Sequence, residues 1–288
     1  MNTERFNQKL LYLHYMNVLT NRQLLLWLRD DPSLERPLNQ PPIPVQLTPD
    51  QTRKISSYHA SATFNEITSH MSASSTSYLT IFNELYPERL KEIYDPPVVL
   101  YTTGNIDYLT NQHQLAVIGS RKADQYTKNV LQHILPALID SGVGIISGMA
   151  QGADAAAHHL ALTGKTIGIV GSGFQHQYPQ INRSLYQKMI TSHLLISEYP
   201  PYVKPQKHHF PMRNRIIAGC SNGLLITQAA VKSGTMITVD RALEEGRDVF
   251  AVPGPVGHPL SAGTNMLIAQ GAKCTVHADD ILNEWHLL

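Results

Sequence analysis

Residues 115–121, Leu115-Ala116-Val117-Ile118-Gly119-Ser120-Arg121, join four apolar residues to a glycine, a serine and an arginine. A short, continuously apolar run is typical of a strand that is buried on both faces of a parallel sheet. The chain then takes up helical spacing, with one apolar face formed by Val130, Leu131, Ile134, Leu135, Leu138 and Ile139. The stretch therefore predicts a strand, a tight turn and a covering helix, which is the repeating unit of an α/β fold.

The same alternation continues along the rest of the chain. Two short strands are predicted at 78–81 and 98–101, and further buried strands at 144–146, 166–170, 194–196, 224–226 and 249–252, most of them separated by helical segments. This pattern predicts an α/β fold with a doubly wound, Rossmann-like, mostly parallel sheet.

The first 72 residues have a different pattern. Apolar residues recur at helical spacing between Leu10 and Leu28, and a second amphipathic stretch covers about Asp50 to Met71. Five prolines between 32 and 44 interrupt the pattern and indicate an irregular connection. We predict a small all-helical domain over 1–72, a Ser/Thr-rich link over 72–77, and the Rossmann-like domain over 78–288.

Composition excludes several classes of protein. The chain has 288 residues, 23 basic and 22 acidic, so its net charge of +1 does not identify a partner. No apolar run is long enough for a membrane helix, and the N-terminus lacks the features of a signal peptide. The only two cysteines, Cys220 and Cys274, argue against a disulfide scaffold or a zinc cluster. We expect a cytoplasmic globular protein with no membrane segment, no metal and no cofactor.

Ligands of a doubly wound sheet bind beyond the carboxyl ends of the strands, so the segments after the strands are candidate sites. Four of them are rich in small residues: 119–121, 147–154, 171–173 and 197–201. The glycines of the first three segments are explained equally well by a tight turn or by the close approach of a ligand. Arg121 favours a phosphate ligand at the first segment, because it places a cation beside free backbone N–H groups.

Several strings that resemble known motifs stand in the wrong context. Gly142-Val143-Gly144 precedes a strand where a dinucleotide fingerprint follows one, and Gly164-Lys165-Thr166 leads into a strand where a P-loop leads into a helix. Residues 219–223 match the nucleophile-elbow string but also precede a strand. The pairs His158-His159 and His208-His209 lack the spacing of metal ligands.

The stretch from Lys204 to Gly219 concentrates cations around one aromatic residue, with Lys207, His208, His209, Phe210, Arg213 and Arg215 close together. Pro211 predicts a helix that starts there, which places both arginines near the helix N-terminus, where cations oppose the helix dipole. We therefore predict anion binding. The alternative is an ion pair with Glu198 or Asp240. Phe210 fits either the core or a stacking platform for single-stranded nucleic acid.

A last candidate segment, Ser233-Gly234-Thr235, opens the helix that runs to Gly246. Its hydroxyl and backbone N–H groups suit a phosphate, although ordinary N-capping explains the serine or the threonine alone.

The sequence resembles the bacterial DNA-processing protein A family, DprA, also called Smf. The resemblance rests on the candidate segments after the strands, the stretch around Phe210 and Ser233-Gly234-Thr235, which follow the family's order together with Tyr178-Pro179, Asn182 and Phe250-Ala251-Val252-Pro253-Gly254. The resemblance extends from about Tyr78 to Ala272. It implies a Rossmann-like domain that binds and protects single-stranded DNA during natural transformation and helps load the recombinase RecA. It also implies a homodimer without catalytic turnover. The N-terminal helices resemble the family's sterile-alpha-motif-like domain, and the C-terminal winged helix of some members is expected to be missing.

The resemblance also implies DNA-binding residues. They are Ser120 and Arg121 after the first strand, Arg183, Lys207 and Phe210 as basic and stacking residues, and Arg213 and Asn214 at a pocket. The residue patterns described above add Gly119, Arg215, Ser233, Gly234 and Thr235 to the predicted DNA-binding set. Two positions depart from the family pattern. Gln228 stands where members usually have Glu, and Gln175 where they usually have Asp, which removes negative charge near the expected site.

Two other functions remain open at this stage. The chain is similar to the lysine-decarboxylase-like phosphoribohydrolases, which hydrolyse nucleoside monophosphates, but Gln228 speaks against their carboxylate chemistry. The second open function is that of a pure interaction protein whose DNA pocket is vestigial. If the chain dimerises, we expect the interface at Met266, Leu267 and Ile268, because three adjacent apolar residues are more than one helix face can bury inward.

Overall fold

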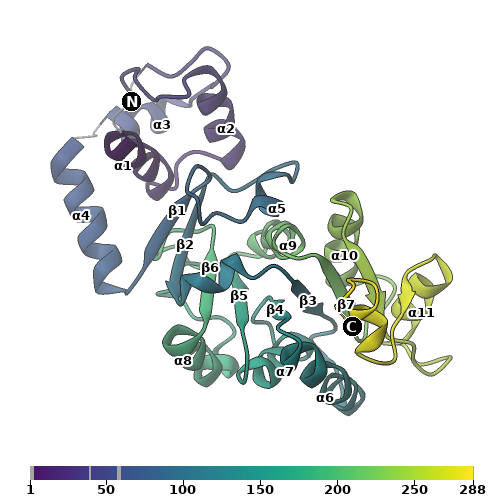
Figure 1. Cartoon of the computed structure of the whole chain (residues 1–288). Helices are drawn as coiled ribbons and strands as arrows, with labels where there is room; N and C mark the ends of the chain where they lie inside the picture. Colours follow the sequence, from purple (N-terminus) through teal and green to yellow (C-terminus); the bar gives the residue numbers. More distant parts are fainter. Residues whose placement is uncertain (1–2, 39, 57–59, 288) are drawn as a thin grey trace.

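The centre of the molecule is a nine-stranded sheet with the strand order β1-β2-β6-β5-β4-β3-β7-β8-β9 (Figure 1). The computed structural model describes residues 3–38, 40–56 and 60–287. The strands are β1 (Ser77–Thr80), β2 (Val99–Gly104), β3 (Gln114–Ile118), β4 (Gly144–Ser147), β5 (Thr166–Val170), β6 (Leu194–Ser197), β7 (Gly223–Ile226), β8 (Asp248–Ala251) and β9 (Lys273–Cys274). From β6 to β9 all neighbours are parallel, whereas β2 pairs antiparallel with both β1 and β6. The predicted mostly parallel, doubly wound sheet is confirmed.

The strand order places a topological switch point between β3 and β7. Strands β4, β5 and β6 succeed one another away from one side of β3, while β7, β8 and β9 succeed one another away from its other side. β3 and β7 pair directly, with Leu115 opposite Gly223 and Ile118 opposite Ile226. The loops that leave these two strands therefore diverge at the carboxyl edge, where such sheets bind ligands.

Helices cover both faces of the sheet, which explains why its strands are continuously apolar. Leu115 and Val117 of β3 belong to the core beneath α6 (Gln125–Asp140) and α7 (Ala153–Ala161). Ala116 and Ile118, which alternate with them, belong to the core beneath α9 (His209–Cys220) and α10 (Gly234–Glu244). Figure 1 shows α6, α7 and α8 (Arg183–Ser192) grouped together, apart from α9 and α10.

The N-terminal helices pack directly against the β2 end of the sheet. They are α1 (Thr3–Tyr15), α2 (Asn21–Asp30), α3 (Pro49–Ser56) and α4 (Ala60–Ala73). Leu10 and Trp27 belong to the same buried cluster as Val99 and Tyr101 of β2. The Tyr101 hydroxyl lies 3.1 Å from His14 Nδ1, so a polar contact also joins α1 to the sheet. The division into domains at 72–78 stays a prediction.

Several boundaries differ from the sequence-based ones. The amphipathic stretch 50–71 forms α3 and α4, and residues 57–59 between them lie outside the described residues. α4 extends to Ala73 and β1 begins at Ser77, so the predicted link is shorter than expected. β9 was not predicted, because a strand of two residues is too short to show a hydrophobic periodicity. α9 begins at His209, so Pro211 is its third residue, which is tolerated because the first-turn N–H groups have no partner within a helix.

The expected dimer interface at residues 266–268 is wrong for Leu267. Met266, Leu267 and Ile268 lie on α11 (Ala262–Ala269). Leu267 is 4% exposed and belongs to the core of its own chain, and Ile268 packs against the same core. Leu267 is therefore not available to a partner, because α11 turns it toward β8 and α10, while Met266 and Ile268 remain half-buried.

The remaining helices are short: α5 (Glu88–Lys91), η1 (Ile106–Thr110), η2 (Gln180–Asn182) and α12 (Asp279–Leu282). In the part of the chain that the structure describes, no helix combines the length and the apolar character needed to span a bilayer.

Candidate nucleic-acid interface

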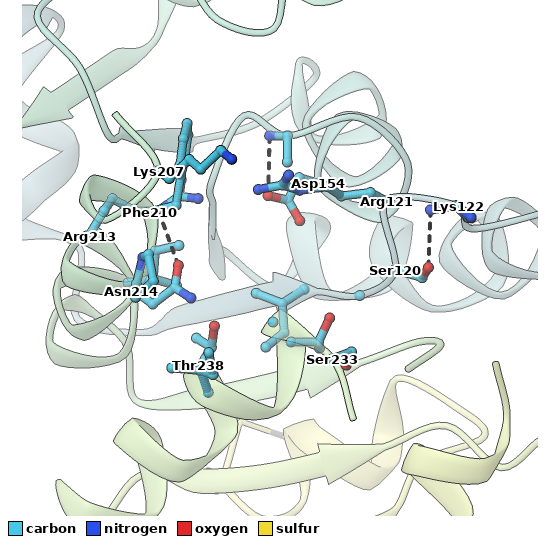
Figure 2. Close-up of a pocket in the computed structure, with 18 residues that line it drawn as sticks. Ser120, Arg121, Lys122, Asp154, Lys207, Phe210, Arg213, Asn214, Ser233 and Thr238 are labelled. Carbon is cyan, nitrogen blue, oxygen red and sulfur yellow. Dashed lines mark hydrogen bonds between the residues drawn. The ribbon is translucent and has the colours of Figure 1, made fainter. Parts of the chain in front are cut away.

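A pocket of about 480 Å³ opens at the carboxyl edge of the sheet, beside the switch point (Figure 2). It is called the main pocket below. The loops after β3 and β4 contribute to it, as do the N-terminal ends of α9 and α10. It brings together most of the predicted residues: Gly119, Ser120, Arg121, Lys207, Phe210, Arg213, Asn214, Ser233, Gly234 and Thr235.

The loop after β3 presents two cations to the main pocket. The Ser120 N–H donates to the backbone oxygen of Gln228 at 2.7 Å, and the Ser120 hydroxyl accepts from the Lys122 N–H at 3.0 Å. Gly119 is required by the close packing, because a Cβ there would lie 2.7 Å from Ala153 Cβ. The loop is thus fixed through its backbone, and the Arg121 and Lys122 side chains are exposed.

The Gln228 side chain stabilises the segment that follows this loop. Its buried side-chain oxygen accepts hydrogen bonds from the Asp124 N–H at 3.2 Å and from the Thr127 hydroxyl at 2.8 Å. A hydrogen bond from Gln228 also lowers the pKa of the Asp124 carboxyl. Gln228 does not line the main pocket, and neither does Gln175, which is exposed elsewhere. The two departures from the family pattern therefore leave the lining of the pocket unchanged.

Arg213 forms part of the floor. It is 4% exposed, and its Nη1 donates to the backbone oxygen of Gly148 at 2.5 Å and to that of Ile169. A Cβ on Gly148 would lie 2.3 Å from Arg213 Nη1, so only glycine leaves room for the guanidinium. Arg213 thus ties α9 to β4 and β5 and contributes positive charge from below.

Asp154 is the one carboxylate that lines the main pocket within the described residues. Its Oδ2 accepts from the backbone N–H groups of Gly148 and Ala150, both at 3.2 Å. Burial raises the pKa of the Asp154 carboxyl, and the nearby Arg213 opposes this effect. The carboxylate is therefore engaged in shaping the loop after β4.

The first turn of α9 supplies the aromatic residue. The Phe210 ring is half-buried, and its centroid lies 5.5 Å from the Arg121 guanidinium carbon and 5.6 Å from the centroid of the Tyr178 ring. Lys207 precedes the helix, is exposed, and points into the same space as Arg121 (Figure 2). The main pocket thus holds two cations beside an aromatic ring.

The N-terminus of α10 completes the pocket. Ser233 is the N-cap residue, but its hydroxyl makes no capping bond and, among the described residues, is buried without a hydrogen-bond partner. Gly234 and Thr235 follow at the first positions of the helix, where backbone N–H groups lack intrahelical acceptors. This end of the helix suits an anion.

The charges of the main pocket are unbalanced. Arg121, Lys122 and Lys207 have no carboxylate within 4 Å in the described part of the chain. With Arg213, four cations face one carboxylate, so the potential in the pocket is positive. The described ranges contain no group of three His, Cys, Asp or Glu side chains that could hold a metal ion.

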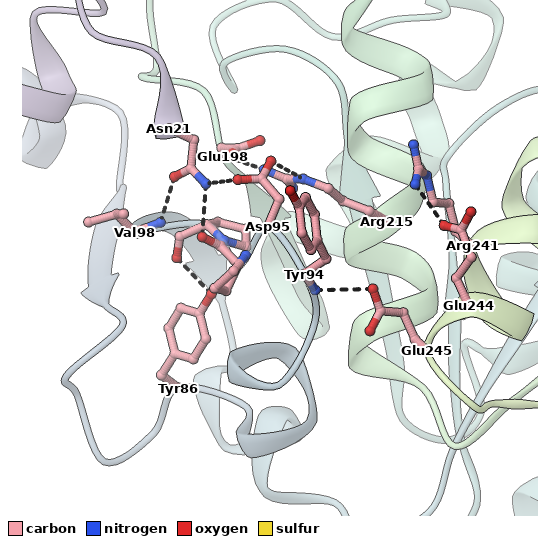
Figure 3. Close-up of polar contacts among 12 residues, drawn as sticks. Asn21, Tyr86, Tyr94, Asp95, Val98, Glu198, Arg215, Arg241, Glu244 and Glu245 are labelled. Carbon is pink, nitrogen blue, oxygen red and sulfur yellow. Dashed lines mark hydrogen bonds and ion pairs between the residues drawn. The ribbon is translucent and has the colours of Figure 1, made fainter. Parts of the chain in front are cut away.

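Arg215 corrects the prediction of a DNA contact at that position. Its side chain is 7% exposed, and it donates to Glu198 Oε1 at 2.5 Å and to Asp95 Oδ2 at 3.1 Å (Figure 3). Arg215 lines neither the main pocket nor its neighbouring cavity. The ion-pair alternative holds here, because α9 turns Arg215 away from the pocket and toward Glu198, which follows β6, and Asp95, which precedes β2.

Arg183 also lies outside the main pocket. It is the first residue of α8 and is exposed. Its neighbour Asn182 is buried and donates to the backbone oxygens of Met149 and Ala150 at 3.0 and 3.1 Å, which fixes the loop after β4. A DNA contact by Arg183 stays a prediction, since it would require a strand that extends beyond the pocket.

The structure adds residues that the sequence-based set lacked. Lys122, Asp154 and Thr238 line the main pocket, and Tyr178 packs against Phe210. Lys122 follows Arg121 directly, and Thr238 lies one helical turn after Gly234, so adjacency and helical spacing were the available signals. No spacing places Tyr178 beside Phe210, because the contact joins the loop before η2 to the first turn of α9.

Comparison with known families matches residues 77–286 to the family of the DNA recombination-mediator protein A. The chain belongs to this family. It is 44% identical over 208 residues to the DNA processing protein DprA of Bacillus subtilis, covering 72% of this chain and 70% of that protein. It is 43% identical over 208 residues to the DprA of Streptococcus pneumoniae, covering 72% and 73%.

Two solved structures of the family are similar in fold to this chain. The DNA processing protein A of Streptococcus pneumoniae matches with a TM-score of 0.79 and 36% identity, over 96% of this chain and 97% of that one. The protein from Helicobacter pylori matches with a TM-score of 0.67 and 30% identity, over 73% of this chain and 96% of that one, and its structure is described for its single-stranded DNA binding mode. The resemblance found in the sequence is confirmed.

Proposed function

We propose that the main pocket binds single-stranded DNA. The observation that carries this proposal is the cluster of unpaired cations, Arg121, Lys122 and Lys207, around the half-buried Phe210 ring. Cations that track a backbone beside a ring that stacks bases are the two elements of single-strand recognition. The single-stranded DNA binding of the Helicobacter pylori relative supports the proposal.

On this proposal each part of the pocket has a role. A backbone phosphate lies between Lys207 and Arg121 or at the N-terminus of α10, where the Ser233 hydroxyl and free N–H groups are donors. A base stacks on Phe210. In a duplex the bases are paired inside the helix, so the ring cannot reach a base face. The site therefore selects single strands.

We propose further that the protein is non-enzymatic and acts in the cytoplasm during natural transformation, protecting single strands and helping to load RecA. Asp154 supports the non-enzymatic role, because two backbone N–H groups of the loop after β4 donate to its carboxylate, which gives it a structural task. Release of free base from a nucleoside monophosphate by the wild type, absent in Arg121→Ala, would contradict it. Faster RecA filament formation on oligo-dT in the presence of the protein would support the loading role.

A homodimer is also proposed, with Met266 and Ile268 of α11 at or near its interface. Sedimentation at micromolar concentration tests the oligomeric state. A dimer that Met266→Glu dissociates would support this placement, and a wild-type monomer would contradict it.

The salt dependence of binding tests the DNA contacts. Each phosphate that is neutralised on a single strand contributes about −0.7 to the slope of log K against log salt. Arg121→Ala and Lys207→Ala are each expected to flatten the slope by about that amount and to weaken binding to every sequence. Fluorescence anisotropy of labelled oligo-dT between low and physiological salt measures both quantities.

Lys165→Ala is the matched control. Lys165 is also exposed, but it precedes β5 and lies at the amino edge of the sheet, opposite the pocket. Its slope should equal that of the wild type. Wild-type slopes in both Arg121→Ala and Lys207→Ala would remove the main pocket from the DNA path.

A further inference from the structure

A second, smaller cavity of about 90 Å³ adjoins the main pocket and is called the side cavity below. Arg121, Phe210 and Arg213 line both hollows, so they form the wall between them. Tyr178 and Gln151 line only the side cavity. A chain of nucleotides that leaves the main pocket over this wall enters the side cavity next.

Tyr178 offers an aromatic surface in the side cavity. Its side chain is 46% exposed, although aromatic residues are usually more deeply buried. Its ring centroid lies 5.6 Å from that of Phe210, with the two planes inclined by 47°. A base inserted between them would need about 3.5 Å on each side, so the rings are too close together to admit one. The outer surface of Tyr178 is the part that remains free for stacking.

Hydrogen bonding and packing hold Tyr178 and Phe210 in place. The backbone oxygen of Tyr178 accepts a hydrogen bond from the buried Tyr186 hydroxyl at 2.8 Å. Phe210 in turn lies against the backbone of Gly171, where an added Cβ would be 3.3 Å from its ring. A rigid aromatic pair loses little conformational entropy when a base stacks on it.

Arg121 stands where the two hollows meet. Its side chain is exposed, has no carboxylate partner among the described residues, and places its guanidinium 5.5 Å from the centre of the Phe210 ring. An exposed cation–π contact of this kind is worth about 0.5–1 kcal/mol, so a phosphate can displace it. The phosphate that links two nucleotides, one in each hollow, lies within reach of this guanidinium.

We propose that the side cavity is a second base subsite, in which Tyr178 stacks the nucleotide adjacent to the one held in the main pocket, while Arg121 binds the phosphate between them. The unit recognised is thus a dinucleotide of single-stranded DNA. This inference rests on the proposed function of the main pocket and adds a neighbouring position and a stacking residue to it.

Dinucleotides with one base removed test the subsite. The full chain is titrated, in competition with labelled oligo-dT, with 5′-phosphorylated dithymidylate and with its two abasic versions, which lack either the 5′ or the 3′ base. The wild type is expected to bind each abasic version about tenfold more weakly than the complete dinucleotide, since stacking contributes about 1–3 kcal/mol per base. Tyr178→Leu should abolish the loss for one abasic position and keep it for the other.

Two variants serve as controls. Tyr178→Phe keeps the ring and should behave like the wild type. Lys207→Ala should weaken all three dinucleotides and leave their ratios unchanged. The tenfold loss that Tyr178→Leu retains at the other position shows that this variant is folded and that its main pocket is intact.

The outcomes separate this inference from the proposed function. If Tyr178→Leu discriminates against both abasic positions as the wild type does, the side cavity is not a base subsite, while the main pocket stands. If the wild type does not bind oligo-dT at all, both proposals are overturned.

Discussion

Arg213 and Arg215 are two residues apart on α9, and their guanidinium groups contact different parts of the molecule. Arg213 reaches under the main pocket to the backbone oxygens of Gly148 and Ile169. Arg215 reaches the carboxylates of Glu198 and Asp95, and Asp95 also accepts from the Asn21 side chain at 2.7 Å (Figure 3). One arginine supports the pocket floor, and the other links α9 to α2.

The buried ion pair predicts a large stability effect at Arg215. Arg215→Met leaves Glu198 buried with its charge uncompensated, which is expected to lower the free energy of unfolding by about 3–5 kcal/mol. Adding Glu198→Gln should recover much of that loss, because the buried charge is removed. Urea unfolding of the single and double variants measures this. Equal stability of Arg215→Met and the wild type would show that the pair contributes nothing.

Gly148 gives a prediction about the pocket floor. A Cβ at Gly148 meets a guanidinium that is already held by two carbonyl oxygens and has no free direction in which to move. Gly148→Ala is therefore expected to cost about 1–3 kcal/mol of stability and to weaken oligo-dT binding.

Gly164→Ala is the comparison for that variant. An added Cβ at Gly164 would lie 2.4 Å from Ile139 Cγ2, so this variant also introduces a close contact, but Gly164 stands before β5, away from the pocket. Oligo-dT binding should be unchanged in Gly164→Ala. Equal binding by the two variants would show that the position of Arg213 does not matter to the pocket.

At the scale of elements, the contact between α1 and β2 depends on a buried histidine. His14 is 9% exposed beside the Tyr101 hydroxyl, and burial lowers its pKa to about 4. In the unfolded chain its pKa is about 6.5, so between pH 6.5 and 4 the unfolded state binds more protons. The stability that neutral His14 provides is therefore present above pH 6.5 and is lost as the pH falls toward 4.

This titration predicts a difference between the wild type and His14→Gln. One proton contributes a slope of up to about 1.4 kcal/mol per pH unit, and the wild type should lose stability more steeply than the variant by about this amount. Urea unfolding at a series of pH values between 7 and 4 measures it. His158, whose burial lowers its pKa to about 3, titrates in both proteins and does not affect the difference. Parallel curves would contradict a buried neutral His14.

The elements differ in how well the sequence predicted them. Strands buried on both faces, such as β3 and β5, appear as apolar runs, so their positions were predicted to within a residue or two. The start of α9 was misplaced, because Pro211 fits the first turn at more than one position. β9 has two residues and is held by its pairing with β8, so it has no local signal.

The sequence predicted which loops form the site, but not the direction of every side chain in it. Loops that follow parallel strands converge at one edge, so the gathering of Arg121, Lys207 and Phe210 follows from the topology. The side on which an arginine leaves a helix depends on tertiary partners. Glu198 and Asp95 are 17 and 120 residues from Arg215, and nothing in the spacing distinguishes its fate from that of Arg213.

For the whole molecule, the topology explains how an almost neutral chain presents a positively charged pocket. The net charge is +1, yet the switch point gathers four cations and one carboxylate around a single pocket. Local charge, not total charge, sets the potential that a strand meets. Several acidic residues elsewhere on the chain form ion pairs, such as Glu244 with Arg241 and Glu88 with Lys91.

The most direct test of the central claim is the binding of labelled oligo-dT to the whole protein, followed by fluorescence anisotropy at two salt concentrations with and without excess unlabelled duplex. A single-strand pocket predicts tight binding at low salt that weakens as salt rises and that duplex does not displace. Absence of binding at low salt, or its complete displacement by duplex, would contradict the claim.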